Sequence, residues 1–96
     1  MKATVEARIE PGRLLAMVDE VMPEIIEIRR YLHRHPELSG EEKQTARFVA
    51  EKCAQWNIPV RSGIGGHGLL ARISAAHADT WVALRADMDA LPIHDA

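Results

Sequence analysis

Residues 35–57 read HPELSGEEKQTARFVAEKCAQWN, and this stretch separates a helical first part of the chain from a different second part. Pro36 disfavours the α conformation in the residue before it, so a preceding helix should end here. Ser39 and Glu42 have the spacing of a capping box, in which the side chain of each residue bonds the backbone N–H of the other. A second helix should follow and end at Asn57, a residue type that favours the left-handed conformation after a helix.

An amphipathic helix is predicted before Pro36, because apolar residues recur there at intervals of four and three positions. Pro23 lies within this pattern, which therefore predicts either one kinked helix or a second helix that begins at Pro23. We expect the helix to end near His33–Arg34. Residues 1–12 show no sustained period and are predicted to form a frayed lead-in. The apolar face comprises Leu14, Val18, Val21, Ile25, Ile28 and Leu32.

Three short runs rich in branched apolar residues follow Asn57 and predict three strands. They read IPVRS at 58–62, LLARIS at 69–74 and WVALRA at 81–86. The last run is almost entirely apolar, so we expect it to be covered on both faces. Two helices followed by three strands predict an α/β domain over residues 13–96.

The sequence GIGGHG at 63–68 matches the Gly-x-Gly-x-x-Gly spacing of dinucleotide-binding sites. In those sites a helix follows the glycines, and its N-terminus binds the phosphates. Here the run that follows, at 69–74, is a predicted strand. A glycine-rich hairpin or bulge is therefore the favoured interpretation.

Composition excludes several classes of protein. The 96 residues allow one small domain or a piece of a larger one. The net charge is −2, from 12 Lys and Arg against 14 Asp and Glu, and the basic residues are scattered, which argues against nucleic-acid binding. The single cysteine, Cys53, permits no internal disulfide. No apolar stretch is long enough for a signal peptide or a membrane span, so we expect a cytoplasmic protein.

Two carboxylates, Asp87 and Asp89, follow the third predicted strand. Residues i and i+2 of an extended chain point to the same face, and carboxylates at the end of a buried strand require a metal, cations or backbone donors as partners. Ligands also bind at the carboxyl ends of strands in open α/β sheets. Alternatively, the pair caps the following loop. Arg85 lies on the same strand face as Asp87 and could neutralise one of the two charges as an ion pair. Spacing alone leaves both interpretations open.

His33 and His35 could add ligands to Asp87 and Asp89, and a small metal-binding protein is a further hypothesis. A separation of two residues places side chains on nearly opposite sides of a helix, so the histidines converge only where the chain is already extended at His35. A histidine at the end of the helix and another in the loop are therefore favoured over metal ligation.

Three motifs, in this combination and order, resemble the start of an M20-type amidohydrolase. They are LHRHPELS at 32–39, GIGG at 63–66 and LRADMDALPI at 84–93. The resemblance covers about residues 24–94 and points to the branch of hippurate hydrolases and N-acyl-amino-acid amidohydrolases. It implies an N-terminal piece of a zinc-peptidase-like α/β catalytic domain, without the lid and dimerisation domain. The implied reaction is hydrolysis of an N-acyl amino acid to a carboxylate and a free amino acid.

The resemblance also implies a divalent metal (Mn, Zn, Co or Ni) that activates water in the full-length parent, which is expected to be a homodimer or homotetramer. Asp89 matches the carboxylate that orients a metal ligand in this family, whereas Asp87 stands where many relatives have a histidine ligand. In this branch the metal ligands come from a later Cys-Gly-His-Asp-x-His segment.

That segment is expected after Ala96, so no bound metal is expected within this chain. We therefore expect a fragment that is inactive alone. The alternative is a non-catalytic α/β module that pairs with another chain.

Overall fold

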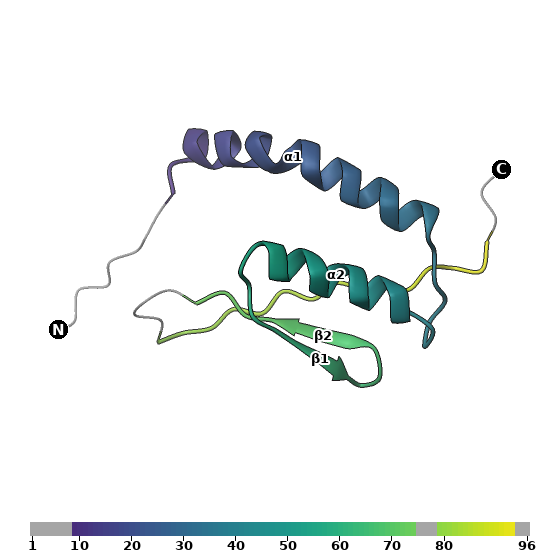
Figure 1. The fold of residues 1–96 in the computed structure, drawn as a ribbon. Coiled ribbons are helices and arrows are strands. Elements are labelled where there is room, and N and C mark those ends of the chain that lie inside the picture. Colours follow the sequence, from purple (N-terminus) through teal and green to yellow (C-terminus); the bar gives the residue numbers. More distant parts are fainter. Residues whose placement is uncertain (1–8, 75–78, 94–96) are drawn as a thin grey trace. The chain divides into compact units, whose positions relative to one another are not determined.

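The computed structural model describes residues 9–74 and 79–93, which contain two helices and a two-stranded antiparallel sheet (Figure 1). The chain divides into two units, residues 1–34 and residues 35–96. The predicted combination of helices followed by strands is confirmed, and the described residues form two strands instead of the three predicted. In the described part of the chain, neither helix has the length and apolar character needed to cross a bilayer.

The described part of the first unit, residues 9–34, contains one helix, α1 (Pro11–Arg34), which continues through Pro23. The alternative of two helices is therefore wrong. Pro11 occupies the first helical position, where a missing N–H costs nothing. The helix ends at Arg34, as predicted from the proline at position 36.

The predicted domain spans residues 13–96, and only its first boundary can be compared with the structure. The helix begins two positions before residue 13, so the last part of the predicted lead-in is helical. Residues 1–8 of that lead-in lie outside the described residues. Ala96, the predicted end of the domain, also lies outside them. The extent of the domain therefore stays a prediction.

The second helix, α2 (Lys43–Gln55), begins later than the capping box requires. Its N-cap residue is Glu42, which makes no side-chain capping bond. Ser39 instead lies in a turn closed by a bond of 2.9 Å from the N–H of residue 41 to the carbonyl oxygen of residue 38, with Gly40 at φ 82°. The predicted capping box is wrong, because this turn delays the start of the helix and leaves Ser39 outside the N-cap position.

The end of α2 agrees with the sequence prediction. Asn57 has φ 57°, and its N–H donates to the carbonyl oxygen of Ala54 at 3.1 Å. The N–H of Ile58 donates to the carbonyl oxygen of Cys53 at 2.8 Å. These two bonds form a Schellman motif, which satisfies carbonyl groups that the helix end leaves free. Cys53 on this helix is buried.

A glycine-rich hairpin joins β1 (Val60–Ile64) to β2 (Gly68–Ala71), and α2 packs on both strands (Figure 1). The pairing shifts register between Ser62 and Ile64, as the predicted bulge requires. Gly65 and Gly66, in the connecting turn, have φ 62° and 107°, which favour glycine. The strands occupy slightly different positions from the predicted runs at 58–62 and 69–74.

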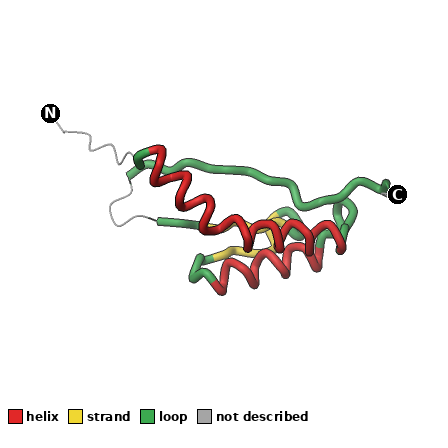
Figure 2. Tube along the Cα trace, turned by 90° about the horizontal axis from the view of Figure 1, so that it is seen from above, coloured by secondary structure: helices red, strands yellow, loops and turns green. Residues whose placement is uncertain are grey.

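The predicted third strand at 81–86 does not form. Residues 79–89 are an extended loop (Figure 2). Ala90, directly after this loop, forms an isolated parallel bridge with Leu38. Val82 is 85% exposed and Leu84 97% exposed, so the expected cover on both faces is absent from the described residues. The prediction is wrong because an apolar run becomes a strand only where neighbouring strands supply hydrogen-bond partners along it.

Substitutions at Asn57 test the helix stop. Asn57→Gly should raise the free energy of unfolding, because glycine adopts the left-handed conformation without a Cβ clash, and Asn57→Ala should lower it by about 1 kcal/mol. Urea unfolding followed by circular dichroism measures both changes. Equal stability of the two variants would contradict the assigned backbone conformation.

Gly68 tests the hairpin, because a Cβ atom at this position would collide with the carbonyl oxygen of Ile64. Gly68→Ala should therefore destabilise the chain by roughly 1–3 kcal/mol, the usual cost of overpacking. Gly12→Ala is the matched control, since the nearest atom to its added Cβ is 3.8 Å away and alanine favours helices. The same unfolding measurement should show no loss for the control; a loss as large as that of Gly68→Ala would contradict the prediction.

Candidate functional site

The carboxylate of Glu37 binds the first turn of α2. Its Oε2 atom accepts the N–H of Gln44 at 3.1 Å, and its Oε1 atom accepts both the N–H and the hydroxyl of Thr45, the latter at 2.6 Å. Thr45 is buried, with 7% of its surface exposed. The N–H groups at the start of a helix have no partner within the helix. Glu37 therefore supplies, from seven and eight residues upstream, the acceptors that an N-cap side chain normally provides.

These contacts lower the pKa of Glu37 below its ordinary value of 4.5. The largest cause is the hydrogen bond from the Thr45 hydroxyl, which favours the ionised carboxylate. Partial loss of water around the carboxylate acts in the opposite direction, and smaller lowering effects come from the N–H groups of Thr45 and Gln44 and from the charge of His67. Glu37 is therefore an ionised acceptor near neutral pH, with its negative charge at the positive end of the helix dipole.

The backbone of Glu37 binds a different segment. Its carbonyl oxygen accepts the N–H of Ala90 at 2.7 Å, next to the parallel bridge between Leu38 and Ala90. Ala90 directly follows Asp89, one of the two predicted site residues. Glu37 thus contacts α2 through its side chain and the segment carrying Asp87 and Asp89 through its main chain.

Sequence reasoning missed Glu37. The rules for helix capping consider residues within about four positions of the helix start, whereas the acceptor here lies on the far side of a turn. The available signal was an acidic residue between a proline and a Leu-Ser-Gly turn, within the HPELS part of the first motif. Only the folded turn shows that its carboxylate reaches residues 44 and 45.

Asp87 forms an ion pair with Arg85, with 2.7 Å between the Oδ1 and Nη2 atoms. The side chains are 62% and 86% exposed respectively, so this pair lies in water and contributes little to stability. The structure therefore agrees with the prediction that Arg85 could neutralise one of the two carboxylates. Asp89 is also exposed. Its predicted role as an orienting carboxylate has no partner among the described contacts and stays a prediction.

The described residues do not fit a divalent metal. Over 9–74 and 79–93, no three or more His, Cys, Asp or Glu side chains are placed to hold an ion. The hypothesis of a metal site built from His33, His35, Asp87 and Asp89 therefore has no support in this part of the chain. His33 lies in the last turn of α1, and His35 follows the helix end, as predicted.

The metal ligands that the resemblance implies are expected after Ala96, and that position lies outside the described residues. The structure therefore leaves their place as a prediction. Among the described residues with a predicted role, Asp89 lies nearest in sequence to the expected ligand segment.

Comparison with curated proteins gives related sequences that cover most of this chain. YhaA of Bacillus subtilis is 46% identical over 78 residues, which are 81% of this chain and 20% of that protein. The N-acyl-L-amino acid amidohydrolase of Geobacillus stearothermophilus is 43% identical over 79 residues, 82% of this chain and 21% of that protein. The hippurate hydrolase of Campylobacter jejuni is 34% identical over 82 residues, 85% of this chain and 21% of that protein.

No family model matches the chain, and no solved structure matches it. The chain spans about a fifth of the length of the curated relatives. These relatives include the two types of amidohydrolase that the motifs predict, so the resemblance to the M20-type enzymes is confirmed. Over about four fifths of its length, the chain is therefore similar in sequence to these amidohydrolases.

Proposed function

We propose that this chain is part of a hydrolase that cleaves the amide bond of an N-acyl amino acid of the hippurate type. The products are a carboxylate and a free amino acid. The observation that carries the proposal is the 43% and 34% identity to an N-acyl-L-amino acid amidohydrolase and a hippurate hydrolase over more than four fifths of the chain.

Amide hydrolysis requires a water oxygen to bond to the acyl carbon, the C–N bond to break, and a proton to reach the leaving nitrogen. In the proposed enzyme, a divalent metal (Mn, Zn, Co or Ni) would polarise the carbonyl group and lower the pKa of the water. No described residues form its ligand set. The proposed contribution of this chain is Asp89, a carboxylate that orients a group at the reaction centre.

Asp87 has a smaller role in this proposal. Its contact with Arg85 occupies one carboxylate oxygen, and both side chains are exposed. An aspartate in such a pair contributes charge balance more readily than catalysis. The proposal therefore assigns the larger functional effect to Asp89 and treats Asp87 as a partner of Arg85.

The whole enzyme is proposed to be a cytoplasmic homodimer or homotetramer that acts on a small molecule. The 96-residue chain alone is proposed to be inactive, because the resemblance implies that the metal ligands belong to a later segment. A second candidate function, a non-catalytic module that pairs with another chain, is favoured by the exposed run at 81–86. Val82 and Leu84, 85% and 97% exposed, would form part of a strand on such a partner.

A chimeric enzyme tests the proposed function. The matched 79-residue segment of the Geobacillus N-acyl-L-amino acid amidohydrolase is replaced by that of this chain, and hydrolysis of N-acyl amino acids and hippurate is measured. The chimera should be active. Asp89→Asn in the chimera should lower activity roughly 10–100-fold, as expected when an orienting partner is lost. Asp87→Asn should have a smaller effect.

Asp19→Asn, an exposed aspartate on α1, is the matched control and should leave the activity of the chimera unchanged. The isolated 96-residue chain should show no turnover under the same conditions. A folded but inactive chimera would contradict the proposed function. Turnover by the isolated chain that a chelator abolishes would contradict its proposed inactivity. A defined complex formed by the isolated chain, together with an inactive chimera, would favour the non-catalytic module.

A further inference from the structure

We propose that Glu37 is a positioning residue, whose bonds to the start of α2 hold the backbone of Asp89 in place. The carboxylate fixes Glu37 against Gln44 and Thr45, and the carbonyl oxygen of the same residue holds the N–H of Ala90. Only the part played by Asp89 in catalysis rests on the proposed function. The mechanical coupling between α2 and the Asp89 segment stands without it.

The hydrogen bond to Ala90 acts directly on Asp89. A peptide unit is planar, and the unit that contains the Ala90 N–H also contains the Cα atom of Asp89. Holding that N–H at 2.7 Å from the carbonyl oxygen of Glu37 therefore restricts where the Asp89 side chain begins. The two carboxylate oxygens of Glu37 accept three donors from α2, so the Glu37 side chain is itself fixed against the helix.

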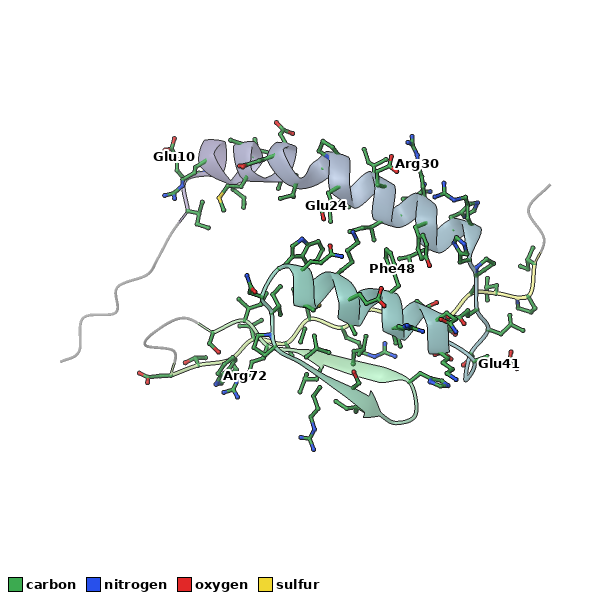
Figure 3. The ribbon with its side chains drawn as sticks, in the orientation of Figure 1. Glu10, Glu24, Arg30, Glu41, Phe48 and Arg72 are labelled. Carbon is green, nitrogen blue, oxygen red and sulfur yellow. The ribbon has the colours of Figure 1, made fainter. Side chains whose placement is uncertain are left out.

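Other described contacts of the segment lie at its beginning, where Asp79 also has an interaction partner, or within the segment. At its beginning, Trp81 lies under the guanidinium group of Arg72, with 4.5 Å between the guanidinium carbon and the ring centre. Arg72, labelled in Figure 3, follows β2. The ion pair between Arg85 and Asp87 lies within the segment and anchors it to nothing else. Near Asp89, the described backbone attachment is the bond from Ala90 to Glu37.

The coupling should depend on pH in a defined direction. Because the folded pKa of Glu37 is lowered, the bonds to α2 are fully present above its ordinary value of 4.5 and are lost as the pH falls through the lower, folded value. The nearby hairpin contributes His67, whose charge favours the ionised carboxylate. Other titratable or charged groups on the surrounding elements are His35, Glu41 and Glu42 in the same loop, Lys43 on α2, and Asp89.

Amide hydrogen exchange in the isotope-labelled 96-residue chain tests the coupling. Glu37→Gln should reduce the protection of the Thr45 and Ala90 amides together, each on the order of tenfold, because a charged acceptor is replaced by a weaker neutral one. Glu41→Gln makes the same change in the same loop and should alter neither amide; Figure 3 labels Glu41 before α2. The amide of Leu70 in the hairpin reports whether the whole unit has unfolded.

Two substitutions at Thr45 test the same coupling without changing the charge. Thr45→Val has a similar shape and removes the hydroxyl donor, so Ala90 should lose protection. Thr45→Ser keeps the hydroxyl and should preserve that protection. In the unmodified chain, protection at Ala90 should also fall below the folded pKa of Glu37, and Glu37→Gln should abolish this step.

One result would overturn the proposal: Glu37→Gln reduces protection at Thr45, and protection at Ala90 stays unchanged in both Glu37→Gln and Thr45→Val. It would show that Glu37 caps α2 alone. Equal losses at Ala90 in Thr45→Val and Thr45→Ser would overturn it as well. These measurements need no turnover, so an inactive chimera would contradict the proposed function and leave this inference standing.

Discussion

The ionised carboxylate of Glu37 at the start of α2 is the interaction on which the arrangement of the second unit depends. It satisfies N–H groups that the helix cannot pair internally, and it binds the hydroxyl of the buried Thr45. The carbonyl oxygen of the same residue accepts a hydrogen bond from the N–H of Ala90. One residue in a short loop therefore joins the helix to the extended segment that carries Asp87 and Asp89.

Local signals predicted the helices and the hairpin well, because the residues responsible act on their own backbone. The proline at position 36 ends α1, Asn57 ends α2 in a left-handed conformation, and the glycines at 63–68 permit the bulged turn. The capping box failed because a turn at 38–41 separates Ser39 from the helix start. The strand at 81–86 failed because strand formation depends on partners distant in sequence, which an apolar run cannot reveal.

The candidate site could be predicted in part. The functional roles of Asp87 and Asp89 stay predictions. Sequence spacing predicted that Arg85 could neutralise one of the two carboxylates, and the structure contains an ion pair between Arg85 and Asp87. It could not identify Glu37, whose role depends on two contacts made through different atoms, one with the start of α2 and one with Ala90. The LHRHPELS and LRADMDALPI motifs lie far apart in the sequence, and the bond from Ala90 to Glu37 brings their backbones together.

Scalar coupling across the hydrogen bond between the Ala90 nitrogen and the Glu37 carbonyl carbon tests the central claim most directly. A long-range carbonyl–nitrogen NMR correlation on the labelled 96-residue chain near neutral pH measures it. We expect a correlation between Ala90 and Glu37, at a strength comparable to those within α2. Strong correlations within α2, with none between Ala90 and Glu37, would contradict the claim that Glu37 joins the helix to the Asp89 segment.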